Sequence, residues 1–275
     1  MTAARDLQRR ARATLRALPT MARIAFAEAL AYRAEVVVWT LATTMPLVML
    51  ALWLAVAEEA PVGRWGQREL ITYFLCAFMV RQLTGSWSCW QINAEVRDGT
   101  LAMRLLRPVH PMVAYAIEQL VAAPVRGMLA IPVAAVALAW VDAPPLARDP
   151  VVWLLWAISM LGAWLISLLA NFAIGCTALF VESSVKIMDI WLALFFVLSG
   201  YTIPVELFPR AVRAIGDWLP FRYQLGLPIE LMTGIHDRAA ALSLLGRQWL
   251  MVALLAAVVT IVWRRGIGRF AAYGG

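Results

Sequence analysis

The most informative single residue for function is an arginine inside an apolar stretch. The stretch covers about residues 70–90, and Arg81 lies near its middle. An arginine at the centre of a bilayer costs about 2.5–3.5 kcal/mol on insertion scales, so we expect Arg81 to face protein or a water-filled cavity. Polar residues follow it at helical steps of three and four, which predicts a polar helix face of Thr84, Ser88, Gln91 and Glu95.

Two interpretations of this polar face are open. In the first, it lines a translocation path that favours anionic headgroups, and the path residues are Arg81, Thr84, Ser88 and Gln91. In the second, Arg81 forms a structural ion pair with Glu118 or Asp189. Glu118 and Arg126, both in the next apolar run, are interpreted as structural or as snorkelling to the membrane surface.

The sequence holds no pattern for covalent, metal or nucleotide chemistry. The histidines, His110 and His236, are far apart and have no HExxH pattern or neighbouring cysteine, so no metal site is expected. Lys186 is the only lysine and no glycine run precedes it, so the sequence has no phosphate-binding G-x-x-x-x-G-K-[ST] loop. An intramembrane enzyme would need a nucleophile–base pair or paired carboxylates, and neither is visible. We therefore do not expect the chain itself to be an enzyme or to bind a cofactor.

A second informative segment, residues 95–111, follows the arginine-bearing stretch. Gly99 permits a sharp bend, and Pro108 and Pro111 end a short amphipathic helix. The leucines that fit its apolar face are Leu101, Leu105 and Leu106. Because a short loop between membrane helices needs no apolar helix of its own, we expect this helix to dock into a groove on a soluble partner.

Membrane helices must position these residues, because the composition excludes a soluble fold. Of the 275 residues, 63% are hydrophobic and 15% charged, and the mean hydropathy is +0.75. An ordinary soluble domain is about one quarter charged, so this chain has too few polar residues to cover a surface in water. The net charge of +7 comes from arginines that flank apolar runs, so no nucleic-acid partner is expected. The odd number of cysteines, all in or beside apolar runs, argues against a disulfide.

We predict an all-α polytopic membrane protein with six transmembrane helices, since each needs about 20 apolar residues. One transmembrane domain, 1–275, would comprise an interfacial helix (1–35), a six-span bundle (36–263) and a cytosolic tail (264–275). The apolar runs cover about residues 36–57, 70–90, 112–140, 151–181, 187–201 and 244–263. Basic residues concentrate on the side that holds the N-terminal segment, the 95–111 segment and the tail, so both termini are predicted to be cytosolic.

Three further segments carry expectations. Arg5, Arg9, Arg12 and Arg16 share one helical face, which predicts a basic helix lying in the membrane interface. Residues 200–247 combine four prolines with many apolar residues, which predicts a re-entrant helical hairpin or, equally, a plain external cap. In the fourth run, small or polar residues recur every four positions, which favours close helix packing over substrate contact. They are Ser159, Ala163, Ser167, Asn171 and Gly175.

With these features, the chain resembles the permease subunits of ABC-2 type ABC exporters over essentially its whole length. The most specific similarity is Gly99-Thr-Leu-Ala-Met-Arg-Leu-Leu-Arg-Pro-Val109, which looks like the G-x-(L/I)-x-x-x-L-L-R-P-V stretch of one ABC-2 branch. The S-G-Y-x-I-P-x-x-x-F-P stretch at 199–209 and Leu219-Pro220-Phe221 also look like this family.

The resemblance implies that the turn after the second span is a coupling helix that fits a cleft on an ATPase. That role would fall on Arg97, Asp98, Gly99, Thr100, Leu101, Leu105, Leu106 and Arg107. It also implies external re-entrant helices at residues 204–234. The implied partners are two copies of a cytosolic ABC ATPase, which bind ATP and Mg, a second permease chain, identical or related, and membrane lipid.

The leading expectation is thus the permease of an ATP-driven exporter of amphiphilic or lipid-like cargo in a plasma membrane, such as a bacterial inner membrane. The alternative is an ion-coupled secondary transporter. Such transporters usually combine broken helices or ionisable groups at mid-membrane with two related halves. No convincing repeat between halves is visible here, and only Arg81 lies clearly deep in a span.

Overall fold

The structure, a computed structural model, describes residues 16–28, 31, 38, 41, 43–141 and 146–270. Every regular element in these ranges is helical, apart from one isolated bridge between Val62 and Trp65, so the all-α prediction is confirmed. After a helical stretch at residues 16–28, the elements are α3 (Met45–Glu59), α4 (Gln67–Thr84), α5 (Ser88–Arg97), α6 (Leu101–Leu105), α7 (Pro111–Trp140), α8 (Pro150–Cys176), η1 (Thr177–Leu179), α9 (Val185–Leu198), η2 (Val205–Leu207), α10 (Arg210–Gly216), α11 (Pro220–Gln224), α12 (Gly226–Met232) and α13 (Arg238–Ile267).

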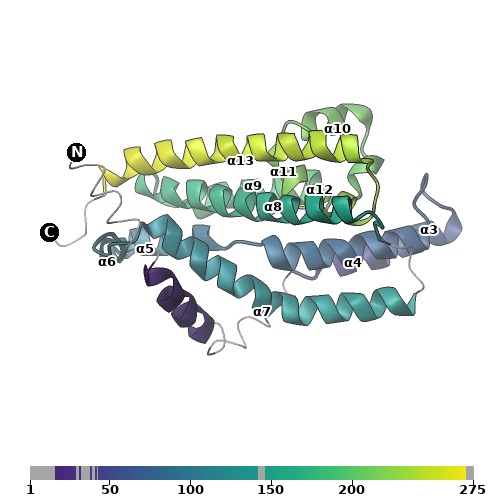
Figure 1. The fold of residues 1–275 in the computed structure, drawn as a ribbon. Helices are drawn as coiled ribbons and strands as arrows, with labels where there is room; N and C mark the ends of the chain where they lie inside the picture. The colour runs from purple at the N-terminus through teal and green to yellow at the C-terminus, as the bar shows by residue number, and fades with distance from the viewer. Residues whose placement is uncertain are drawn as a thin grey trace.

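The long helices form an elongated bundle (Figure 1). Within the described ranges, three are long and apolar enough to cross a membrane: α7, α8 continued by η1, and α13. α6 and the C-terminal end of α13 lie at one end of the bundle, whereas α10 lies at the other (Figure 1). The count of six spans stays a prediction, because α9 has only 14 residues and most of the residues before α3 lie outside the described ranges.

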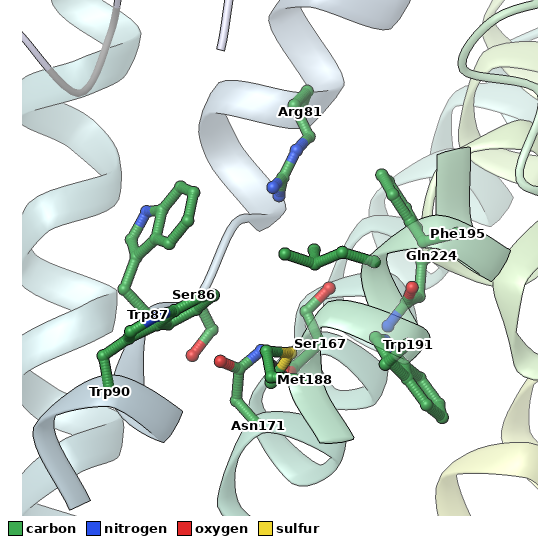
Figure 2. A pocket seen from close by; sticks show the side chains of 11 residues that line it. Arg81, Ser86, Trp87, Trp90, Ser167, Asn171, Met188, Trp191, Phe195 and Gln224 are labelled. Carbon is green, nitrogen blue, oxygen red and sulfur yellow. Dashed lines mark hydrogen bonds between the residues drawn. The ribbon is translucent and has the colours of Figure 1, made fainter. Parts of the chain in front are cut away.

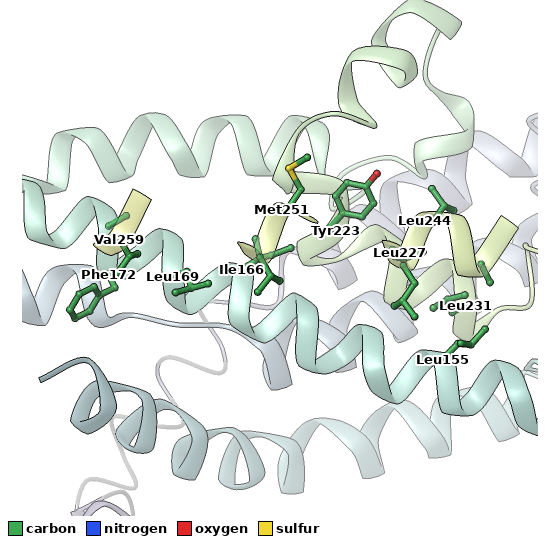
Figure 3. Close-up of a cluster of buried hydrophobic side chains, with 14 of the residues drawn as sticks. Leu155, Ile166, Leu169, Phe172, Tyr223, Leu227, Leu231, Leu244, Met251 and Val259 are labelled. Atoms are coloured by element: carbon green, nitrogen blue, oxygen red, sulfur yellow. The ribbon is translucent and has the colours of Figure 1, made fainter. Parts of the chain in front are cut away.

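The main apolar core lies between α8, α13 and the short helices α11 and α12 (Figure 3). Ile166 and Phe172 of α8 are fully buried in it, together with Leu227 of α12. The repeating residues of α8 are all buried, as close helix packing requires, but Ser167 and Asn171 also line a cavity described below, so the preference for packing over substrate contact stays a prediction. At Gly162 of α8, an added Cβ would lie 2.8 Å from the side chain of Gln248, so this surface of α8 must be small for α13 to approach.

The predicted continuous helix over residues 70–90 is wrong. α4 ends at Thr84 and α5 begins at Ser88, with Gly85 in an extended conformation between them. Gly85 and Ser86 are poor helix formers. α7 supplies the missing hydrogen bonds: Nη2 of Arg126 donates to the Gly85 carbonyl at 3.1 Å, and the Gln119 side chain accepts from the backbone of Trp87. A broken helix inside a membrane bundle requires such partners.

The segment predicted to be external is a series of short helices, η2, α10, α11 and α12, whose starts follow the prolines. Pro204 and Pro209 precede η2 and α10, and Pro220 begins α11. All of α12 and most of α11 are buried among the long helices. Their depth in the membrane stays a prediction.

The interfacial helix predicted for 1–35 falls largely outside the described residues. Residues 16–28 are helical and lie at the α6 end of the bundle (Figure 1).

Candidate functional site

The segment between α5 and α7 forms a separate short helix at one end of the bundle. α5 ends at Arg97, and Gly99 has a φ of +73°, a conformation that side-chain-bearing residues rarely adopt. This residue turns the chain into α6. The sharp bend predicted from Gly99 is therefore confirmed.

The apolar residues of α6 divide into an anchor and an exposed patch. Leu101 is only 1% exposed, and Leu105 is half-buried, so the three leucines do not share one exposed face. Met103 and Leu106 are 64% and 81% exposed, and we call them the α6 apolar patch. The sequence did not single out Met103, because Leu101 and Leu105 are four residues apart on one side of the helix and Met103 lies between them on the other side. The exposed polar neighbours are Arg97, Asp98, Thr100 and Arg107.

A charged network beneath α6 ties it to α5 and α7. Nε of Arg104 donates to both carboxylate oxygens of Glu95, at 2.9 and 2.8 Å, and its Nη1 donates to Glu118 at 2.9 Å. The Tyr115 hydroxyl also donates to Glu95, and its ring centroid lies 4.2 Å from the Arg104 guanidinium. Such bidentate, charge-assisted contacts fix orientation, so α6 is held rigidly against two longer helices.

The network includes two residues with a sequence-based interpretation, Gln91 and Glu118. Gln91, a predicted path residue, donates from its amide to Glu118 at 3.0 Å. Glu118 binds Arg104 and not Arg81, which confirms its structural interpretation. Burial lowers the pKa of Arg104, but Glu118 and Glu95 raise it above its ordinary value. Arg104 thus stays charged between the two carboxylates.

Arg81, by contrast, has aromatic neighbours. Its guanidinium carbon lies 5.2 Å from the ring centroid of Phe195 and 5.5 Å from that of Trp87, both within cation–π range. Tyr201 supplies a hydrogen-bonding side chain. The predicted ion pair of Arg81 with Glu118 or Asp189 is wrong, because Glu118 serves Arg104 and Asp189 is exposed.

A small cavity lies beside the α4–α5 break (Figure 2). Arg81 reaches it from α4, and Ser167 and Asn171 of α8 line another side. Trp191 and Phe195 of α9 close it with their rings. Figure 2 shows the Arg81 guanidinium directed from the end of α4 into this space.

The other predicted path residues are not gathered around this cavity. The Thr84 hydroxyl donates to the Val80 carbonyl of its own helix at 2.8 Å. The Ser88 hydroxyl lies 3.2 Å from that of Ser86. The break between α4 and α5 interrupts the helical repeat, so Arg81 and Gln91 reach different surroundings.

A family model described as ABC-2 family transporter protein matches residues 41–274, most of the chain. No curated protein matches it significantly.

Proposed function

The chain belongs to the ABC-2 transporter family, and on that premise we propose that it is the permease of an ATP-driven exporter whose ATPase is a separate subunit. The family and the long apolar helices make it a multi-pass membrane component of an ABC transporter. The proposed complex holds two cytosolic ATPase copies, which bind ATP and Mg, and two permease chains, identical or related. The proposed location is a plasma membrane, such as a bacterial inner membrane, with both termini cytosolic.

The observation that carries the proposal is the construction of α6. An exposed pair, Met103 and Leu106, stands on a helix that Arg104 fixes to α5 and α7. Exposed apolar side chains on a rigid helix suit insertion into a groove of a soluble protein. Because Glu118 lies on α7, a push on α6 would pass directly to a long helix of the bundle.

Copurification tests this proposal. The double variant Met103→Asp/Leu106→Asp places two charges in the α6 apolar patch without touching buried residues, so it should fold normally and lose the ATPase. The matched control is Ile215→Asp, which changes an equally exposed apolar residue on α10 at the other end of the bundle. Full ATPase retention by the α6 variant would contradict the docking assignment.

An amphiphilic or lipid-like cargo is the second part of the proposal. Its support is the cavity beside Arg81, which combines one cationic group with tryptophan and phenylalanine rings. Transport by the purified chain alone, driven by an ion gradient and without any ATPase, would instead establish an ion-coupled secondary transporter.

A further inference from the structure

Two arginines from different helices meet at the α4–α5 break. A Cβ at Gly85 would lie 2.9 Å from Nη1 of Arg81, and Nη2 of Arg126 donates to the carbonyl of the same glycine. Arg81 lies near the middle of the α4–α5 segment, and Arg126 lies near the middle of α7. Both charges are therefore far from either end of the membrane-crossing segments.

Neither guanidinium is neutralised by an acid among the described residues. Arg81 has the rings of Trp87 and Phe195 beside its guanidinium, and Arg126 has the Gly85 carbonyl. Arg126 is only 6% exposed. The Nε atoms of both arginines are buried and lack a hydrogen-bond acceptor. Arg222, the other arginine that is buried in the described ranges, is paired: it contacts Asp217 and Glu230.

Two like charges at this depth without a neutralising acid are energetically costly, since burial penalises each charge and the two repel. The Gly85 carbonyl and the aromatic rings offset part of that cost. They provide no negative charge, which a bound anion would provide. The cavity is lined by Arg81 and not by Arg126, and its wall also carries polar groups that could hold the oxygens of an anion: Ser86, Ser167, Asn171 and Gln224.

We propose that Arg81, which lines the cavity, and Arg126, which lies beside it at the Gly85 carbonyl, together attract an oxyanion to the α4–α5 break, namely the phosphate or carboxylate headgroup of the amphiphilic cargo. The aromatic wall, Trp87, Trp191 and Phe195, suits the adjoining apolar part of such a molecule. The cavity volume of about 20 Å³ holds a water-sized group. A whole headgroup therefore enters only when the α9 side chains move away from α4.

This inference rests on the proposed function only for the identity of the cargo, so binding is measured without ATP turnover. The full chain, with any partners that copurify, is placed in phosphatidylcholine nanodiscs. Thermal unfolding is then followed against rising concentrations of short-chain phosphatidylglycerol, of short-chain phosphatidylcholine and of inorganic phosphate. Because a ligand that binds the folded state raises the unfolding midpoint, the concentration dependence gives an apparent affinity.

We expect phosphatidylglycerol, but not phosphatidylcholine, to raise the midpoint of the wild-type chain. Arg81→Gln and Arg126→Gln should each weaken this effect by roughly tenfold or more, as the loss of a charge-assisted contact predicts. The control Arg210→Gln removes an exposed arginine on α10 and should leave it unchanged. Arg81→Lys should retain more binding than Arg81→Gln, because it keeps the charge.

Arg81 carries the test if Arg126→Gln fails to fold, since Arg126 also donates to the Gly85 carbonyl. An effect of inorganic phosphate that depends on both arginines would support the site and assign it to a soluble anion. Equal apparent affinities for the wild-type chain, Arg81→Gln and Arg81→Lys would overturn it, and the arginines would then only stabilise the helix break. Loss of the copurifying ATPase has no bearing on this outcome, so the two proposals fail separately.

Discussion

At the scale of single residues, the charge network beneath α6 is the part of the site with the most defined geometry. Glu118→Gln removes one of the two carboxylates that hold Arg104. We expect this variant to lose about 1–3 kcal/mol of stability, since a half-buried charged donor loses a charged acceptor. If the network transmits motion, ATP turnover of the complex should also become less dependent on cargo. Thermal unfolding and cargo-stimulated ATPase activity are the two measurements.

The control for Glu118→Gln is Arg64→Gln, which breaks an ion pair with Glu206. Arg64 is 54% exposed, so this pair should contribute less than about 1 kcal/mol. Similar losses in both variants would show that the network is no stronger than a surface contact.

Gly162 offers a second residue-scale test, of packing. A methyl group there would meet the Gln248 side chain at 2.8 Å, and Gln248 donates to the carbonyls of Ser159 and Tyr223. Gly162→Ala should therefore cost about 1–3 kcal/mol through overpacking. Gly246→Ala, on α13 with open space around it, should be neutral or stabilise by up to about 1 kcal/mol because alanine favours the helix. The measurement is the denaturation midpoint of each variant, and equal midpoints would contradict the packing argument.

At the scale of elements, the bend between α5 and α6 gives the next prediction. Gly99→Val forces a β-branched residue into a left-handed conformation. We expect α6 to change its angle, so that the α6 apolar patch is misplaced and the ATPase copurifies less. Gly268→Val, at the same end of the bundle with a φ of −70° and open space around it, is the matched control. Equal ATPase recovery from both variants would show that the angle of α6 is unimportant for docking.

The elements also show what the sequence can and cannot predict. The long helices α7, α8 and α13 follow from runs of apolar residues, and the bend at Gly99 follows from a single glycine. The break after Thr84 was missed because apolar residues continue on both sides of it, and the reason it is tolerated lies in Arg126 and Gln119, far away in sequence. Ion pairs between elements are equally hard to predict from sequence. Arg104 of α6 binds Glu118 of α7, and no local spacing reveals this contact.

At the scale of the whole molecule, the predicted orientation in the membrane is based on the distribution of arginines between the two ends of the bundle. Thr100 and Ile215 are exposed and lie at opposite ends of the bundle, next to α6 and on α10. The native cysteines, Cys76, Cys89 and Cys176, are free and buried, so they should give little background with a polar thiol reagent. Single cysteines introduced at these two positions can therefore be labelled without replacing the native cysteines.

We expect a membrane-impermeant maleimide to label Ile215→Cys in intact cells, and to label Thr100→Cys only after the membrane is permeabilised. The physical reason is that the excess of arginine holds the α6 end on the cytosolic side. Each variant serves as the control for the other, because both expose one thiol on a short helix or its cap. Labelling of Thr100→Cys from outside would place α6 beyond the reach of any cytosolic ATPase. Neither exposed apolar residues on α6 nor the Arg104 network could then serve docking, and the coupling proposal would fail at its premise even if the anion site beside Gly85 were real.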